Sequence, residues 1–138
     1  MAGLTDLSLA DLARALRKRE ASAVEVVDAH LARIAALDGR VHAFVAVEAD
    51  AARAAARAAD TARARGTAGA LAGLPVAVKD IFAVVGLVRG NGSRAFADDP
   101  PAAADAPVVA RLRAAGAVIV GTTHMHELAF GPTGVNPG

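Results

Sequence analysis

Residues 74–79 of the chain read LPVAVK, a continuous apolar run closed by one charged side chain. A run without alternation is typical of a strand buried on both faces, and we expect its last residue to emerge at the edge of the sheet. Residues 118–120, which read VIV, predict a second strand of this kind. Between them, Asp105 before Pro107 predicts the cap of a helix that Gly116 ends. Strand, helix and strand in this order favour a right-handed crossover between parallel strands.

The first part of the chain predicts two capped helices. Ser8 and Ser22 each precede an apolar pattern of helical period, and Ser22 is followed three residues later by Glu25, which is the spacing of a capping box. We expect the second helix to end at Gly39. The first helix places its leucines on one face, namely Leu9, Leu12 and Leu16.

A change in composition divides the chain into two parts. Residues 41–47 are β-like, and residues 48–65 form an alanine-dominated helix that Gly66 ends. We therefore expect a single domain whose residues 1–66 are mainly helical and whose residues 67–138 begin an α/β core. The predicted fold class is α/β, with N-terminal helices followed by the first strands and helices of a mostly parallel or mixed sheet covered by helices.

The composition excludes several classes of function. With 54% hydrophobic and 21% charged residues, the 138-residue chain is expected to fold around a core. A net charge of +1 provides no field that would attract nucleic acid or an anionic membrane. The absence of cysteine excludes disulfides, thiolate zinc sites and a cysteine nucleophile, and fits a reducing compartment. No signal peptide pattern and no apolar run of membrane-spanning length is present, so we predict a soluble cytoplasmic protein.

Lys79 is the main candidate for chemistry. It ends an apolar strand, where we expect Val78, Ile81 and Phe82 to surround its ammonium and exclude water. Desolvation disfavours the charged form of a lysine, so a buried amine can act as a base. Asp80 would hold the ammonium charged, but successive strand residues point to opposite faces, so we expect Asp80 to turn towards backbone groups or a helix end. By its spacing alone, Lys79 also fits an ordinary solvated residue.

Several segments together resemble the start of the amidase signature family. These are residues 71–80, Gly92-Ser93, residues 105–121, residues 126–131 and Asn136-Pro137. The helical first half is also similar to the N-terminal region of that family, so the resemblance covers nearly the whole chain. The chain departs from the family at residues 89–91, where threonines are common, and at His42, where an asparagine is common.

The resemblance implies a Ser-cisSer-Lys triad, in which a lysine acts through a bridging serine on the nucleophilic serine and helps to protonate the leaving amine. Only Lys79 is assigned by it. The two serines and the oxyanion-binding backbone of the family lie downstream of Gly138, so we expect a truncated chain that is inactive alone. The implied activity is hydrolysis of the carbon–nitrogen bond of a small-molecule amide, without a cofactor.

Two other functions remain open at this point. The first is the glutaminase subunit of a tRNA-dependent amidotransferase, which the same residues also resemble. It would act with partner subunits, and a homo-oligomer is the alternative assembly. The second alternative is an inactive truncated product without enzymatic function. Because a sheet of few strands leaves edges and an apolar face uncovered, we expect the isolated polypeptide to be poorly soluble or partly folded.

The serines present in the chain have structural interpretations. Ser8 and Ser22 are helix caps, and Ser93 lies in the turn-rich segment 89–94. Without a following helix or a Lys-Ser/Thr pair, this segment favours an ordinary turn over a phosphate loop. In the resembled family, this Gly-Ser pair lies near the active site but is not the nucleophile.

His124, His126 and Glu127 invite interpretation as metal ligands, because residues two apart on a strand point the same way. The other histidines, His30 and His42, lie elsewhere along the chain, so a complete set of ligands is lacking. We therefore predict no metal site and favour structural or substrate-lining roles for this segment.

Overall fold

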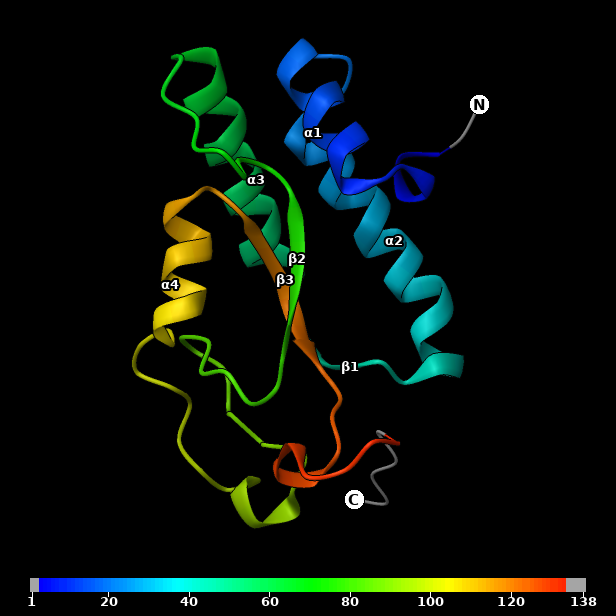
Figure 1. The fold of residues 1–138 in the computed structure, drawn as a ribbon, viewed down its shortest axis with the longest axis vertical. Coiled ribbons are helices and arrows are strands. Elements are labelled where there is room, and N and C mark those ends of the chain that lie inside the picture. The colour runs from blue at the N-terminus through cyan, green and yellow to red at the C-terminus, as the bar shows by residue number, and fades with distance from the viewer. Residues whose placement is uncertain (1–2, 134–138) are drawn as a thin grey trace.

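The computed structural model describes residues 3–133 (Figure 1). In chain order, its elements are η1 (Leu4–Asp6), α1 (Leu9–Lys18), α2 (Ala23–Val41), β1 (Phe44–Val47), α3 (Ala49–Ala64), β2 (Pro75–Lys79), η2 (Arg94–Phe96), α4 (Pro107–Ala114), β3 (Val118–Thr123) and η3 (Glu127–Ala129). Within residues 3–133, no helix has both the length and the apolar character that crossing a bilayer requires.

The strands form one mixed sheet in the order β1-β3-β2. β2 and β3 are parallel, with α4 between them in the chain, and β1 pairs with β3 in the antiparallel direction. The predicted α/β class is therefore confirmed, including its mixed sheet. In the register of the strands, Thr123 at the end of β3 is opposite both Lys79 of β2 and Phe44 of β1. The carboxyl ends of the two parallel strands consequently lie together.

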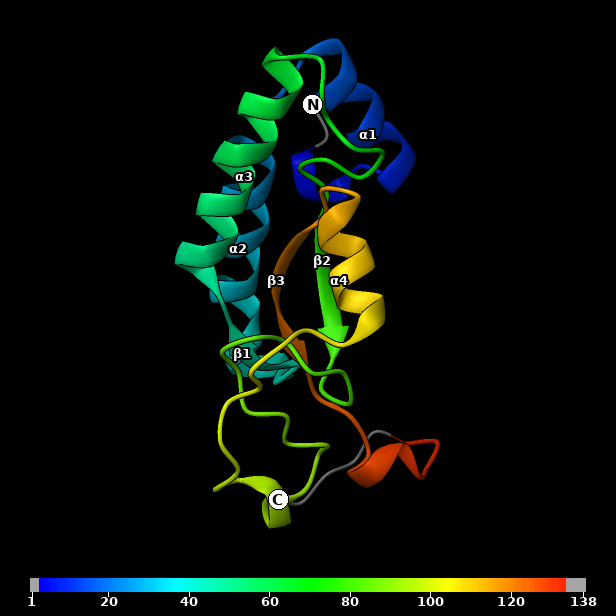
Figure 2. The same cartoon turned by 90° about the vertical axis from the view of Figure 1, so that its left-hand side faces the viewer.

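Helices cover both faces of the sheet (Figure 2). On one face, α1, α2 and α3 pack through side chains such as Leu16 and Val27 onto Val118 and Val120 of β3. On the other face, α4 packs in a cluster that includes Ile119 of β3. Because β3 is buried on both faces, its run of apolar residues is explained without any alternation of polar ones.

Both predicted serine caps are confirmed. Ser8 Oγ accepts a hydrogen bond from the Asp11 N–H at 3.1 Å, and Ser22 Oγ accepts one from the Glu25 N–H at 3.1 Å. The Glu25 carboxylate accepts in return from the Ser22 N–H at 2.8 Å, which completes the capping box of α2. These bonds satisfy N–H groups that a helix leaves unpaired at its start.

The capping box makes stability depend on pH. The Ser22 N–H and then its hydroxyl donate to Glu25 and hold the pKa of its carboxyl below the ordinary 4.5. A lowered carboxyl pKa contributes stability that is present above the unfolded value and is lost as the pH falls through the folded value. We expect the melting temperature to decrease as the pH is lowered below about 4.5, and to decrease less in the Glu25→Gln variant. Thermal melts between pH 2 and 6 measure this; identical pH profiles for the two proteins would contradict it.

The predicted end of α2 at Gly39 is wrong. The helix continues to Val41, and His42 adopts the left-handed conformation with φ of 50°. The Asp38 carboxylate accepts hydrogen bonds from the Ala43 N–H at 2.8 Å and the Phe44 N–H at 3.2 Å, so the chain reverses after His42 instead. For the same reason β1 begins at Phe44, three residues later than the β-like segment suggests.

The predicted cap of α4 by Asp105 is also wrong. The residue before the helix is Ala106, which has no capping side chain, while Pro107 occupies the first turn as expected. The Asp105 carboxylate accepts instead from the Val85 N–H at 2.8 Å and from Arg113 Nε at 2.9 Å. Asp105 therefore joins the loop after β2 to α4, a contact that local spacing does not reveal.

Candidate active site

Lys79 is the last residue of β2, as predicted, but its side chain is exposed. The expectation that Val78, Ile81 and Phe82 would bury it is wrong. Val78 is buried in the cluster beneath α4, Ile81 is half-buried and Phe82 is 39% exposed. Ala77, which shares the face of Lys79 by strand alternation, is exposed as well. Within residues 3–133, that face is open at the end of β2, so the desolvation on which the sequence argument relied is missing there.

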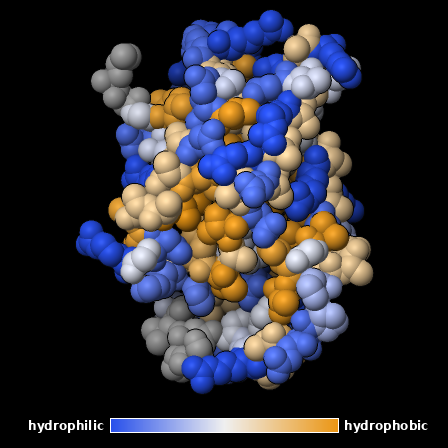
Figure 3. Space-filling view, turned by 180° about the vertical axis from the view of Figure 1, so that it is seen from behind, coloured by the Kyte–Doolittle hydropathy of each residue, from blue (hydrophilic) through white to orange (hydrophobic). Residues whose placement is uncertain are grey.

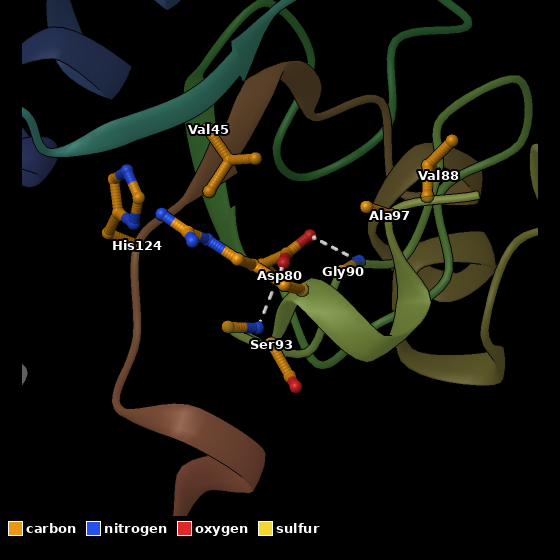
Figure 4. A pocket seen from close by; sticks show the side chains of 9 residues that line it. Val45, Asp80, Val88, Gly90, Ser93, Ala97 and His124 are labelled. Carbon is orange, nitrogen blue, oxygen red and sulfur yellow. Dashed lines mark hydrogen bonds between the residues drawn. The ribbon is translucent and has the colours of Figure 1, made fainter. Parts of the chain in front are cut away.

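Asp80 has the opposite environment and is 1% exposed. Its Oδ1 accepts a hydrogen bond from the Gly90 N–H at 3.3 Å, and its Oδ2 accepts one from the Gly92 N–H at 3.4 Å (Figure 4). The expectation that this carboxylate turns towards backbone groups is therefore confirmed. The Asp80 backbone donates to the Thr123 carbonyl at 3.1 Å and accepts from the Asn91 N–H at 3.3 Å. The turn that contains Gly90, Asn91 and Gly92 is thereby attached to the end of β2.

Ser93 belongs to the same turn. Its hydroxyl donates to Glu127 Oε1 at 2.6 Å and accepts from the Ala95 N–H at 3.3 Å, where it caps η2. The Leu128 N–H donates to the Asn91 carbonyl at 2.8 Å. These bonds support the interpretation of Ser93 as a turn residue. They also join two segments 34 positions apart, and no local pattern in the sequence signals that contact.

A small pocket of about 260 Å³ lies beside this turn. Its lining consists of Val45, Asp80, Val88, Gly90, Gly92, Ser93, Arg94, Ala97 and His124. In Figure 4, Val45 lies on one side of the Asp80 carboxylate and His124 on another, with Val88 and Ala97 across the pocket. Lys79 is not part of this lining, in keeping with the opposite directions of neighbouring residues along a strand. The pocket therefore marks the side of β2 to which Asp80 points.

The histidine segment has no arrangement that would hold a metal ion. His124 lines the pocket, and Glu127 is bonded to Ser93. His30 bonds to the backbone of its own helix, and His42 ends α2. Among residues 3–133, no group of three or more His, Cys, Asp or Glu side chains is placed to bind a metal.

Known proteins are similar to this chain over most of its length. A protein of Salinispora arenicola, named as a subunit of glutamyl-tRNA(Gln) amidotransferase, is 50% identical over 132 residues, which cover 95% of this chain and 27% of that protein. The protein of the same name from Streptomyces coelicolor is 44% identical over 137 residues, covering 99% of this chain and 27% of that protein. The chain thus spans about 27% of the length of these curated relatives.

Solved structures share the fold. The peptide amidase of Stenotrophomonas maltophilia superposes with a TM-score of 0.80 at 34% identity, covering 88% of this chain and 25% of that one. An inhibitor-bound vestigial complex, described as revealing the evolutionary origins of an s-triazine catabolic enzyme, superposes with a TM-score of 0.92 at 41% identity, covering 95% of this chain and 29% of that one. The model of the Amidase family matches residues 25–138. This chain therefore belongs to the amidase family.

Proposed function

We propose that the chain is the N-terminal part of an amidase that hydrolyses a carbon–nitrogen amide bond, with Lys79 as its catalytic base. The observation that carries this proposal is the position of Lys79 at the carboxyl end of β2, within a segment that matches the amidase family. Side chains at the carboxyl ends of parallel strands are well placed for chemistry, because there a rigid sheet positions them and the following loops surround them.

In the proposed mechanism, the Lys79 amine accepts a proton from a bridging serine, which in turn deprotonates a nucleophilic serine. The nucleophile attacks the amide carbonyl, and the lysine then returns the proton to the leaving nitrogen. Ser8, Ser22 and Ser93 do not supply these hydroxyls, because they are engaged as a cap of α1, a cap of α2 and a partner of Glu127. The proposal therefore places both serines outside the 138 residues.

In this proposal the Lys79 amine acts as a base, which burial favours. Because the side chain is exposed within residues 3–133, further protein would have to lie over it. Figure 3 shows apolar side chains exposed on the back of the molecule. At and beside β1, Val41 is 64% exposed, Val45 is 46% exposed and Val47 is 39% exposed. Both β1 and β2 are edge strands of the sheet. Since the curated relatives are longer, with only 27% of their length matched, we propose that further residues cover the open end of β2 and desolvate Lys79, and that they also cover exposed apolar side chains of β1.

The organisation of the protein follows from the same proposal. The cluster between the helices and the sheet contains Leu16 and Val27 from the helical part and Leu74 and Val118 from the α/β part. Because one core joins them, we propose that the two parts belong to a single domain of a cytoplasmic enzyme. Sedimentation of the complete gene product measures whether that enzyme forms homo-oligomers.

A second candidate is the glutaminase subunit of a tRNA-dependent amidotransferase. The observation that favours it is the 50% identity to a protein named as part of glutamyl-tRNA(Gln) amidotransferase. In that case glutamine is the substrate, and partner subunits use the ammonia that this subunit releases. The third candidate is a product without enzymatic activity.

Release of ammonia separates the three candidates. The complete product of the gene is purified, and ammonia is measured with glutamine and with a panel of simple carboxamides, with and without amidotransferase partner subunits. We expect turnover of a carboxamide by the protein alone. Turnover of glutamine only with partner subunits would favour the glutaminase. No ammonia from any amide under either condition would overturn the proposed activity.

A further inference from the structure

We propose that Asp80 is a positioning residue, whose buried carboxylate holds the turn of residues 90–93 against the end of β2 beside Lys79 and makes glycine necessary at position 90. The inference rests on the proposed function in so far as Lys79 is the base. The contacts that Asp80 makes with the turn lie entirely within residues 3–133.

The partners of the Asp80 carboxylate are backbone groups. Only 1% of the residue is exposed, and none of the ion pairs within residues 3–133 includes it. A buried carboxylate is costly unless hydrogen bonds compensate for its lost hydration. Gly90 and Gly92 each donate one N–H to it. The Asp80 carboxylate therefore holds the turn in one position, because any displacement of the turn would leave the carboxylate without these partners.

The two glycines are required for different reasons. Gly92 has φ of 66°, a conformation that side chains disfavour. Gly90 is not among the glycines with positive φ. A Cβ at position 90 would lie 2.9 Å from Asp80 Oδ2 and 3.8 Å from its Cγ, with no other contact within 4 Å outside the neighbouring residues. Glycine at position 90 is thus explained by the carboxylate of Asp80 and not by the backbone.

The turn connects the end of β2 to the segment after β3. Asn91 donates its N–H to the Asp80 carbonyl and accepts from the Leu128 N–H, while Ser93 bonds to Glu127. The Asp80 N–H also donates to the Thr123 carbonyl, across from Lys79. Because Lys79 precedes Asp80 directly, the same bonds fix the backbone from which the amine extends. Loss of the carboxylate is therefore expected to misplace the amine.

A double-mutant cycle tests this inference. Asp80→Ala, Gly90→Ala and the double variant are made in the complete gene product, and kcat, KM and melting temperature are measured. We expect each single variant to lower kcat by roughly 10- to 100-fold with KM within about twofold, since small misplacement of a catalytic group has effects of this size. In the Asp80→Ala background, Gly90→Ala should cost nothing further, because the atom that its Cβ strikes is gone.

Two further variants make the result unambiguous. Gly39→Ala is the matched glycine control, because a Cβ there meets nothing within 4 Å, and it should leave kcat unchanged. Asp80→Asn keeps the shape and one acceptor oxygen, so it should lose less than Asp80→Ala and preserves the test if the alanine variant does not fold. Gly90→Ala should remain harmful in the Asp80→Asn background.

The outcomes separate this inference from the proposed function. Additive losses for Asp80→Ala and Gly90→Ala, or wild-type kcat in Asp80→Ala, would overturn it. If no amide is hydrolysed by any of the proteins, the proposed function fails, and hydrogen exchange at the Gly90 and Gly92 amides tests the geometric part. Protection that is lost in Asp80→Ala and retained in Gly39→Ala supports the attachment of the turn, whereas unchanged protection in both contradicts it.

Discussion

Replacing Lys79 by alanine in the complete gene product is expected to lower kcat for amide hydrolysis by roughly 10²- to 10⁴-fold, the range that a positioned general base contributes. Within residues 3–133 the substitution removes no packing, because the Lys79 side chain is exposed there and the backbone hydrogen bonds of β2 do not depend on it. The measurement is steady-state ammonia release, with circular dichroism as a check on folding.

Lys18 offers a matched control for this variant. It is the other lysine of the chain and lies at the end of α1, where it forms a long, exposed ion pair with Glu20 at 3.7 Å. Lys18→Ala should retain the wild-type kcat. If Lys79→Ala also retained it, the assignment of the base would be wrong, whatever the activity of the protein proved to be.

Replacing Leu16 by alanine is expected to lower the free energy of unfolding by about 2–5 kcal/mol, the range for deleting a buried leucine side chain. Leu16 is 1% exposed and belongs to the cluster between the helices and the sheet. A Cβ on Gly73 would lie 3.6 Å from its Cδ1, so the leucine fills space up to the chain before β2. Removal of its methyl groups leaves a cavity that this backbone cannot readily close.

The same helix contains the control for this prediction. Leu9 is 58% exposed although the helical pattern groups it with Leu12 and Leu16. Leu9→Ala is expected to change the stability by less than about 0.5 kcal/mol, as is usual at exposed positions. Urea unfolding followed by circular dichroism compares the two variants. Equal losses of stability would show that Leu16 is not a core residue of the α1 packing.

The short-range features of the fold could be predicted from the chain because their causes lie within a few residues. The Ser22 and Glu25 box needs only three residues between its partners, and its bonds form as expected. The apolar run before Lys79 predicts a strand because no alternation of polar residues allows a solvated face. In the structure that strand is β2, parallel to β3.

Features that depend on side-chain hydrogen bonds outside the local helical pattern were predicted less well. Gly39 has the composition of a helix end, but Asp38 stabilises the reversal only after His42. Asp105 has the spacing of a cap, yet Val85 and Arg113 bind its carboxylate instead. In each case a local preference worth about 1 kcal/mol or less is overridden by hydrogen bonds that form only in the folded chain.

The order of the residues was enough to establish the family, the α/β class and the position of Lys79 at the end of a strand, because these depend on periodicity, local caps and the succession of motifs. Which side chains near that strand are buried became clear only in the folded chain. There Lys79 is exposed, Asp80 is buried and the Gly90 turn lies against it. Burial is set by what packs over a residue from elsewhere in the chain, and no neighbouring residue in the sequence carries that information.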